Sequence, residues 1–138
     1  MRRRRDAAGQ ALVEFSLAVP VFVLMLLAVF DLGRGVYTYN GLSEAAREIA
    51  RVTAVHPGLV LGASQQTADR VAVQQGLTPG MSAPSYACVR VDGTPSSDNP
   101  CTSGDYVRVT VSSVYQPLAL LGFGGSITLS ATGSSQIP

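Results

Sequence analysis

Few of the 138 residues are of a type and spacing that could support catalysis or metal binding. The single histidine, His56, directly precedes Pro57 and has no nucleophile or carboxylate pair of suggestive spacing nearby. Three aspartates, Asp92, Asp98 and Asp105, are separated by loop residues, so turn formation is their first interpretation and a calcium site is the less favoured alternative. We therefore predict that the protein is not an enzyme and that it holds no catalytic, cofactor or metal site.

Glu14 needs a different explanation, because this carboxylate lies within an apolar run. Residues 11–30 read ALVEFSLAVPVFVLMLLAVF and are interrupted only by Glu14, Ser16 and Pro20. About 20 apolar residues in a helix span the hydrocarbon core of a bilayer. A carboxylate at the centre of that core costs roughly 2.5–3.5 kcal/mol, and less near the interface. Because of this cost, we expect the Glu14 carboxylate to have a function. The alternative is that Glu14 lies at the membrane interface, where its charge is merely tolerated.

Four arginines at positions 2–5 directly precede this run, although the net charge of the whole chain is only +1. Basic residues favour the cytoplasmic side, so the N-terminus is expected to be cytoplasmic and the C-terminal part periplasmic or extracellular. A cleaved secretory signal has the same ingredients, but the run is long for that role. We predict a retained single-pass anchor in the inner (cytoplasmic) membrane, and no nucleic-acid partner.

The only two cysteines, Cys88 and Cys101, both belong to the part expected outside the cytoplasm, where disulfides persist. The residues between them are rich in turn formers, so a bridge would close easily. A zinc site is the alternative, but it needs further ligands and the only histidine is far away in the sequence. We predict a disulfide between the two cysteines.

The helical pattern continues beyond the apolar run and predicts one long helix over residues 10–56, with a kink at Pro20. Pro57 ends this helix because the residue before a proline avoids the helical region. One stripe of the second half consists of Val36, Tyr39, Leu42, Ala46, Ile49 and Thr53. The opposite face carries two acid–base pairs at i,i+3 spacing, which are Glu44–Arg47 and Glu48–Arg51.

The remaining sequence predicts a second helix over residues 64–75, with Gly76 as its C-cap, followed by strands. The expected strands are 85–91, 105–114 and 126–133. An apolar loop over residues 115–125 is expected to pack against the long helix or a partner subunit. The predicted fold class is therefore α+β, with a long N-terminal transmembrane and amphipathic helix packed on a small antiparallel sheet.

A basic leader, Gly9, an apolar run and a glutamate five positions after the glycine together resemble a type IV prepilin processing site. In that family a membrane-embedded peptidase cuts after the glycine. The pair Glu14-Phe15 resembles the Flp/Tad branch of these pilins. The stretch from Gly9 to Pro57 is similar throughout to the TadE-like pseudopilins, and VRVTVSSVYQPLALLGFGGSITLSATGSS resembles their final strands. The likeness is most specific at residues 9–14 and 45–51.

The resemblance implies a pilin-like fold with a leader over residues 1–9, a helix over 10–56 that spans the membrane in 11–30, and an extracytoplasmic α+β domain over 57–138. It implies a minor pseudopilin, cut between Gly9 and Gln10, that is needed for initiation, capping or regulation of a Tad/Flp tight-adherence pilus. Its expected partners are other pilins and pseudopilins of the Tad system, the prepilin peptidase and the inner-membrane assembly platform. It would lie in the inner membrane or be incorporated in a surface pilus.

Two departures qualify the resemblance. Gln10 stands where major pilins more usually have a small or apolar first mature residue, and a folded C-terminal region of this length is absent from the short Flp major pilins. A physical role for Glu14 follows if the leader is removed, because Gln10 would then carry a free α-ammonium. In a packed bundle that ammonium would pair with Glu14 of a neighbour and fix the register. The alternative function is a signal-anchored membrane protein with an extracytoplasmic ligand-binding domain.

Overall fold

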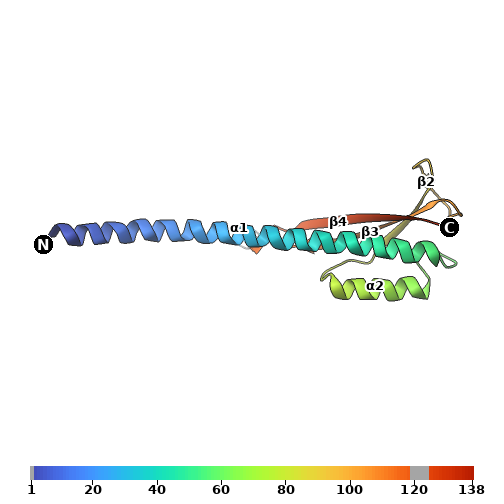
Figure 1. The fold of residues 1–138 in the computed structure, drawn as a ribbon, viewed down its shortest axis with the longest axis horizontal. Coiled ribbons are helices and arrows are strands. Elements are labelled where there is room, and N and C mark those ends of the chain that lie inside the picture. Colours follow the sequence, from blue (N-terminus) through green and yellow to red (C-terminus); the bar gives the residue numbers. More distant parts are fainter. Residues whose placement is uncertain (1, 119–124) are drawn as a thin grey trace.

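The computed structural model describes residues 2–118 and 125–138, with side chains from Gly9 onward. Helix α1 (Arg2–Val55) extends along the molecule, and all other elements gather beside its C-terminal half (Figure 1). The helix begins eight positions before the predicted start, because the arginines and alanines ahead of Gln10 are good helix formers. It passes through Pro20 without interruption, and the predicted kink there stays a prediction.

Four antiparallel strands form one sheet in the order β2-β1-β3-β4. Their bounds are β1 (Ser85–Val89), β2 (Pro95–Ser96), β3 (Tyr106–Tyr115) and β4 (Ile127–Gln136). The three predicted strands are present with shifted ends, and β4 continues three residues beyond Gly133. The sequence did not predict β2, because two residues are too few to show an alternating pattern.

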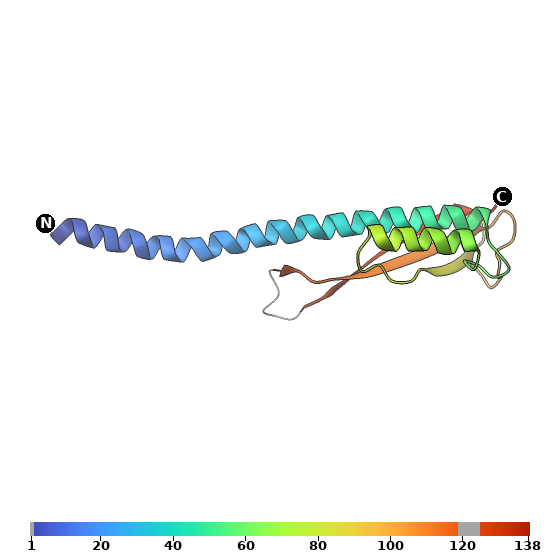
Figure 2. The same ribbon diagram turned by 90° about the horizontal axis from the view of Figure 1, so that it is seen from below.

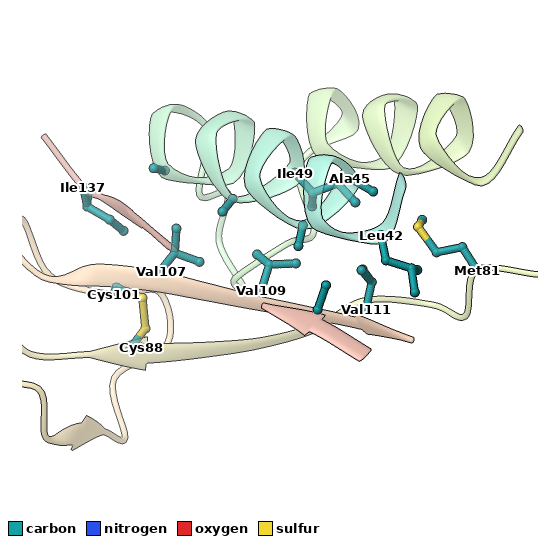
Figure 3. Packing of buried hydrophobic residues seen from close by; sticks show 14 residues of the cluster. Leu42, Ala45, Ile49, Met81, Cys88, Cys101, Val107, Val109, Val111 and Ile137 are labelled. Carbon is teal, nitrogen blue, oxygen red and sulfur yellow. A yellow bond between two sulfur atoms is a disulfide. The ribbon is translucent and has the colours of Figure 1, made fainter. Parts of the chain in front are cut away.

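The sheet packs one face on α1, and the turned view in Figure 2 shows the two layers side by side. Leu42 and Ile49 of α1 are fully buried against Val109 and its neighbours on β3 (Figure 3). Gly133 of β4 lies directly against the α1 backbone at Ala46 and Arg47. The α+β class, with a long apolar N-terminal helix on an antiparallel sheet in a pilin-like arrangement, is confirmed.

The predicted stripe on α1 is right from Leu42 onward and wrong at its first two positions. Val36 and Tyr39 are 53% and 49% exposed. The face toward the sheet passes instead through Asp31, which is 7% exposed, and through Gly35, which lies against the Tyr115 ring. Because neither Asp31 nor Gly35 is an apolar residue with a large side chain, the apolar periodicity did not include them. It pointed to the exposed Val36 and Tyr39 instead.

Helix α2 (Gln65–Leu77) covers another side of α1. Ser64 is its N-cap, and the Ser64 hydroxyl accepts a hydrogen bond from the Thr67 N–H at 3.2 Å. The helix continues through Gly76 to Leu77 and has Thr78 at its C-cap, so the predicted Gly76 cap is wrong. Thr78 closes the helix in an extended conformation, which requires no glycine.

Both predicted acid–base pairs of α1 form, and the stronger one also joins α1 to α2. Glu48 accepts two hydrogen bonds from Arg51, at 3.1 and 2.9 Å, and lies 3.5 Å from Arg70 of α2. The Arg51 hydrogen bond lowers the pKa of the Glu48 carboxyl below its ordinary value, although partial burial opposes the shift.

This lowered pKa predicts a pH dependence of stability. The contribution of Glu48 is complete above its ordinary pKa of 4.5 and is lost as the pH falls through the lower folded-state pKa. We expect acidification to lower the unfolding temperature of the wild type more than that of Glu48→Gln. Thermal unfolding followed by circular dichroism between about pH 6 and pH 3 measures the difference, and equal losses would contradict it.

Candidate processing and assembly site

Residues 11–26 of α1 are mostly apolar and exposed, and no other described element lies beside them (Figure 1). An 18-residue window within Gly9–Val55 has a mean hydropathy of 2.5, and none of that window is buried. Such a surface is unstable in water, and its length is enough to cross the hydrocarbon core of a bilayer. Together with the arginines before it, this segment indicates membrane anchoring.

Gly9 and Gln10 are adjacent on this exposed helix, and Glu14 lies one turn further along it. The Gln10 side-chain amide donates a hydrogen bond to a Glu14 carboxylate oxygen at 3.2 Å. A Cβ added at Gly9 would meet nothing within 4 Å, and Phe15 is 69% exposed. Among the described contacts, none requires a glycine at position 9 or an acid at position 14. Cleavage after Gly9 and the register role of Glu14 stay predictions.

Cys88 of β1 and Cys101 form a disulfide, with their Cα atoms 5.4 Å apart, so the predicted bridge is confirmed. Both cysteines are buried (Figure 3). A disulfide is typical of proteins outside the reducing cytoplasm, which indicates an extracytoplasmic domain.

The aspartates considered for calcium have local partners. Asp92 accepts hydrogen bonds from Thr94, Asp98 from Ser96 and Asp105 from Thr102, as turn residues do. Within residues 2–118 and 125–138, no group of three histidine, cysteine, aspartate or glutamate residues is arranged to hold a metal ion.

The structure adds a cluster at the end of the apolar run that the sequence did not predict. Asp31 of α1 accepts a hydrogen bond from the Leu118 N–H at 2.8 Å. The Tyr115 hydroxyl donates to the Asp31 backbone oxygen at 2.7 Å and reaches its carboxylate at 3.3 Å. Arg34 lies 3.6 Å from the Asp31 carboxylate and stacks 5.5 Å from the centre of the Tyr115 ring. We call these four residues the junction cluster.

The junction cluster joins the sheet to α1 just after the apolar run. Partial burial, and next the charge of Asp31, raise the pKa of the Tyr115 phenol above its ordinary value of 10.0. Tyr115 and Leu118 begin the apolar loop that was expected to pack on the long helix. Residues 119–124 of that loop lie outside the described residues, and the contact is seen only at its start.

Asp31→Ala is expected to destabilise the protein, because it leaves the Leu118 N–H without its acceptor and removes one acceptor from Tyr115. Both hydrogen bonds are only partly buried, and an intramolecular hydrogen bond contributes about 0.5–1.5 kcal/mol. Thermal unfolding of the full chain in detergent micelles measures the change. Asp69→Ala is the matched control, since Asp69 is an exposed helical acid that bonds only Gln65 among the described contacts. Equal unfolding temperatures for the two variants would show that the junction cluster contributes nothing.

Comparison with known proteins gives one family. Residues 9–51 match a family model described as TadE-like protein. The matched part includes Gly9, Glu14 and the helical residues Asp31 and Arg34 of the junction cluster. No curated protein and no solved structure gives a match.

Proposed function

We propose that the chain is a minor pseudopilin cut after Gly9, because its residues 9–51 match the model of the TadE-like protein family, which implies a pilin-like protein related to Tad pili. In this role it is needed for the initiation, capping or regulation of a Tad/Flp tight-adherence pilus. Its partners would be other pilins and pseudopilins of that system, the prepilin peptidase and the inner-membrane assembly platform. Its starting location would be the inner membrane, with the C-terminal domain outside.

The observation that carries this proposal is the form of α1. One helix joins an unburied apolar half to an amphipathic half that forms the core of a folded domain. Such a chain can bury its apolar half in a bilayer, or in a bundle in which neighbouring helices replace the lipid. Gly9 stands at the start of the apolar half, where a cut would leave the anchor attached to the domain.

Glu14 gives such a bundle a means of fixing its register. After the cut, the α-ammonium of Gln10 would lie one helical turn, about 6 Å, from Glu14 of its own chain and within reach of a neighbour. Charges attract more strongly in a low-dielectric bundle than in water. A neighbour displaced by one turn would bury both charges without partners, which is strongly unfavourable.

The intact mass of the protein extracted from membranes tests the proposal. In cells that carry the Tad peptidase, the mass should equal that of the chain beginning at Gln10. A full-length mass would contradict the proposal and favour a signal-anchored protein with an external binding domain.

Glu14→Ala is expected to be cut normally and to abolish pilus assembly, because the cleavage glycine remains while the partner of the new ammonium is lost. The length of the product is read by mass spectrometry, and surface pili are counted by electron microscopy. Ser16→Ala is the control, since it removes a polar group from the same segment without removing the charge. Normal pili in Glu14→Ala cells would show that Glu14 is only a tolerated interfacial residue.

A further inference from the structure

A groove of ≈ 780 Å³ lies between α1 and the membrane-proximal end of β3. Phe30, Val114 and Leu118 contribute apolar walls, and Tyr37 lies along α1 one turn further on. Arg34 is the only charged residue that lines the groove within the described part of the chain, and its side chain is 52% exposed. The groove is thus an apolar surface with one cation, which is also 3.6 Å from the Asp31 carboxylate, located where α1 leaves the apolar run.

Gly33 also lines this groove, and the fold does not explain it. A Cβ built at Gly33 meets nothing within 4 Å, and its backbone has no positive φ. A glycine within a helix costs about 1 kcal/mol relative to alanine. Small residues at such positions let another helix approach closely. Among residues 2–118 and 125–138 nothing fills the space at Gly33, which leaves room for a helix from outside the chain.

The N-terminal part of α1 has the complementary character. Residues 11–17 are apolar except for Glu14 and Ser16, and Glu14 is exposed. Twenty residues separate Glu14 from Arg34, which corresponds to about 30 Å along the helix. The hydrocarbon core of a bilayer has this same thickness, about 30 Å. In an inserted chain, Glu14 is therefore near the inner face of the membrane and Arg34 near the outer face.

We propose that the groove binds the N-terminal segment of α1 from a second copy that has moved outward by one membrane thickness, with Glu14 of that copy paired to Arg34. The inference rests on the proposed function, because only assembly into a fibre would draw a subunit outward. Within one chain the two charges lie on a continuous helix and cannot meet. When one of two parallel copies is shifted by one membrane thickness, its Glu14 comes to the same height as Arg34 of the other copy. The shift also places an apolar helix against Gly33.

Site-specific photo-crosslinking in piliated cells tests the contact and keeps both charges. Tyr37 is replaced by p-benzoylphenylalanine, because this residue lines the groove and is 73% exposed. Tyr39 is the matched control, since it is an exposed tyrosine of the same helix that does not line the groove. Irradiation should give a dimer from position 37 and none from position 39, with the attachment site in residues 11–18 of the second copy.

Three further substitutions separate the charge pair from the apolar contact. Arg34→Gln should reduce the dimer about tenfold, the change that corresponds to 1.4 kcal/mol, whereas Arg34→Lys should keep most of it. Gly33→Leu should block the dimer by filling the free space. Formation of Cys88–Cys101 in each variant verifies that the domain has folded. A dimer with the same yield in Arg34→Gln would overturn the charge pairing.

The other outcomes also decide the inference. Adducts to phospholipid would mean that a lipid headgroup occupies the groove, and adducts to a different protein would mean a different occupant; both overturn the proposal. The wild-type chain is monitored in the same cells. If it is cut after Gly9 and pili form but position 37 gives no dimer, the contact is wrong and the proposed function stands. If the chain remains uncut, the proposed function itself fails.

Discussion

Gly133→Ala is expected to destabilise the folded domain by about 1–3 kcal/mol, the usual cost of overpacking a tight core. A Cβ at Gly133 would lie 2.5 Å from the Ala46 carbonyl carbon and 2.6 Å from both the Ala46 oxygen and the Arg47 nitrogen. All three are backbone atoms of α1, so no side-chain rotation relieves the overlap. Either the helix moves away from β4 or the strand bends.

Gly76→Ala is the matched control for this prediction, because the same methyl group should have the opposite effect there. Gly76 lies within α2, and its added Cβ meets nothing within 4 Å. Alanine is favoured over glycine in a helix by about 0.8–1 kcal/mol, so this variant should be slightly more stable than the wild type. Thermal unfolding of the full chain in detergent micelles compares the two. An unchanged or raised unfolding temperature for Gly133→Ala would contradict the close helix–sheet contact.

Gly133 also shows where sequence reasoning reached its limit for this fold. The alternation of Val107, Val109 and Val111 is a local pattern, and it was enough to predict β3 and the face that β3 buries. The same reasoning ended β4 at Gly133, because glycine weakens a strand when only local propensity is considered. The strand continues because residues 134–136 pair with residues 106–108 of β3, and Gly133 itself lies against the backbone of α1. Contacts between segments this far apart leave no local signal.

The candidate site likewise has one part that the sequence could predict and one part that it could not. Gly9 and Glu14 are five residues apart on one helix, so their relation could be predicted from spacing alone. The partners of Asp31 lie 84 and 87 residues later in the chain. Asp31 and Arg34 lie within the stretch that carries the resemblance, but nothing near them in the sequence indicated a hydrogen bond to the end of a strand. The tertiary fold alone brings the junction cluster together, and it also forms the groove beside Arg34.

Gly9→Leu is expected to leave the leader attached and to abolish surface pili. Intact mass should then include the first nine residues, and electron microscopy should show no fibres. The structure predicts no folding defect, because a side chain at position 9 points into open space on an exposed helix. Formation of Cys88–Cys101 verifies folding, and Ser16→Leu is the control for adding leucine to the same segment without altering the cleavage site.

The physical reason for this large effect is that a peptidase acts on an extended peptide bond, whereas α1 is helical on both sides of Gly9. Cleavage therefore requires local unwinding. Glycine lowers the cost of that unwinding by about 1 kcal/mol relative to a good helix former, and it leaves the bond unshielded by a side chain. Leucine reverses both effects while the domain and the apolar half remain unchanged. Cleavage of Gly9→Leu at the wild-type rate would mean that this glycine is not the processing site.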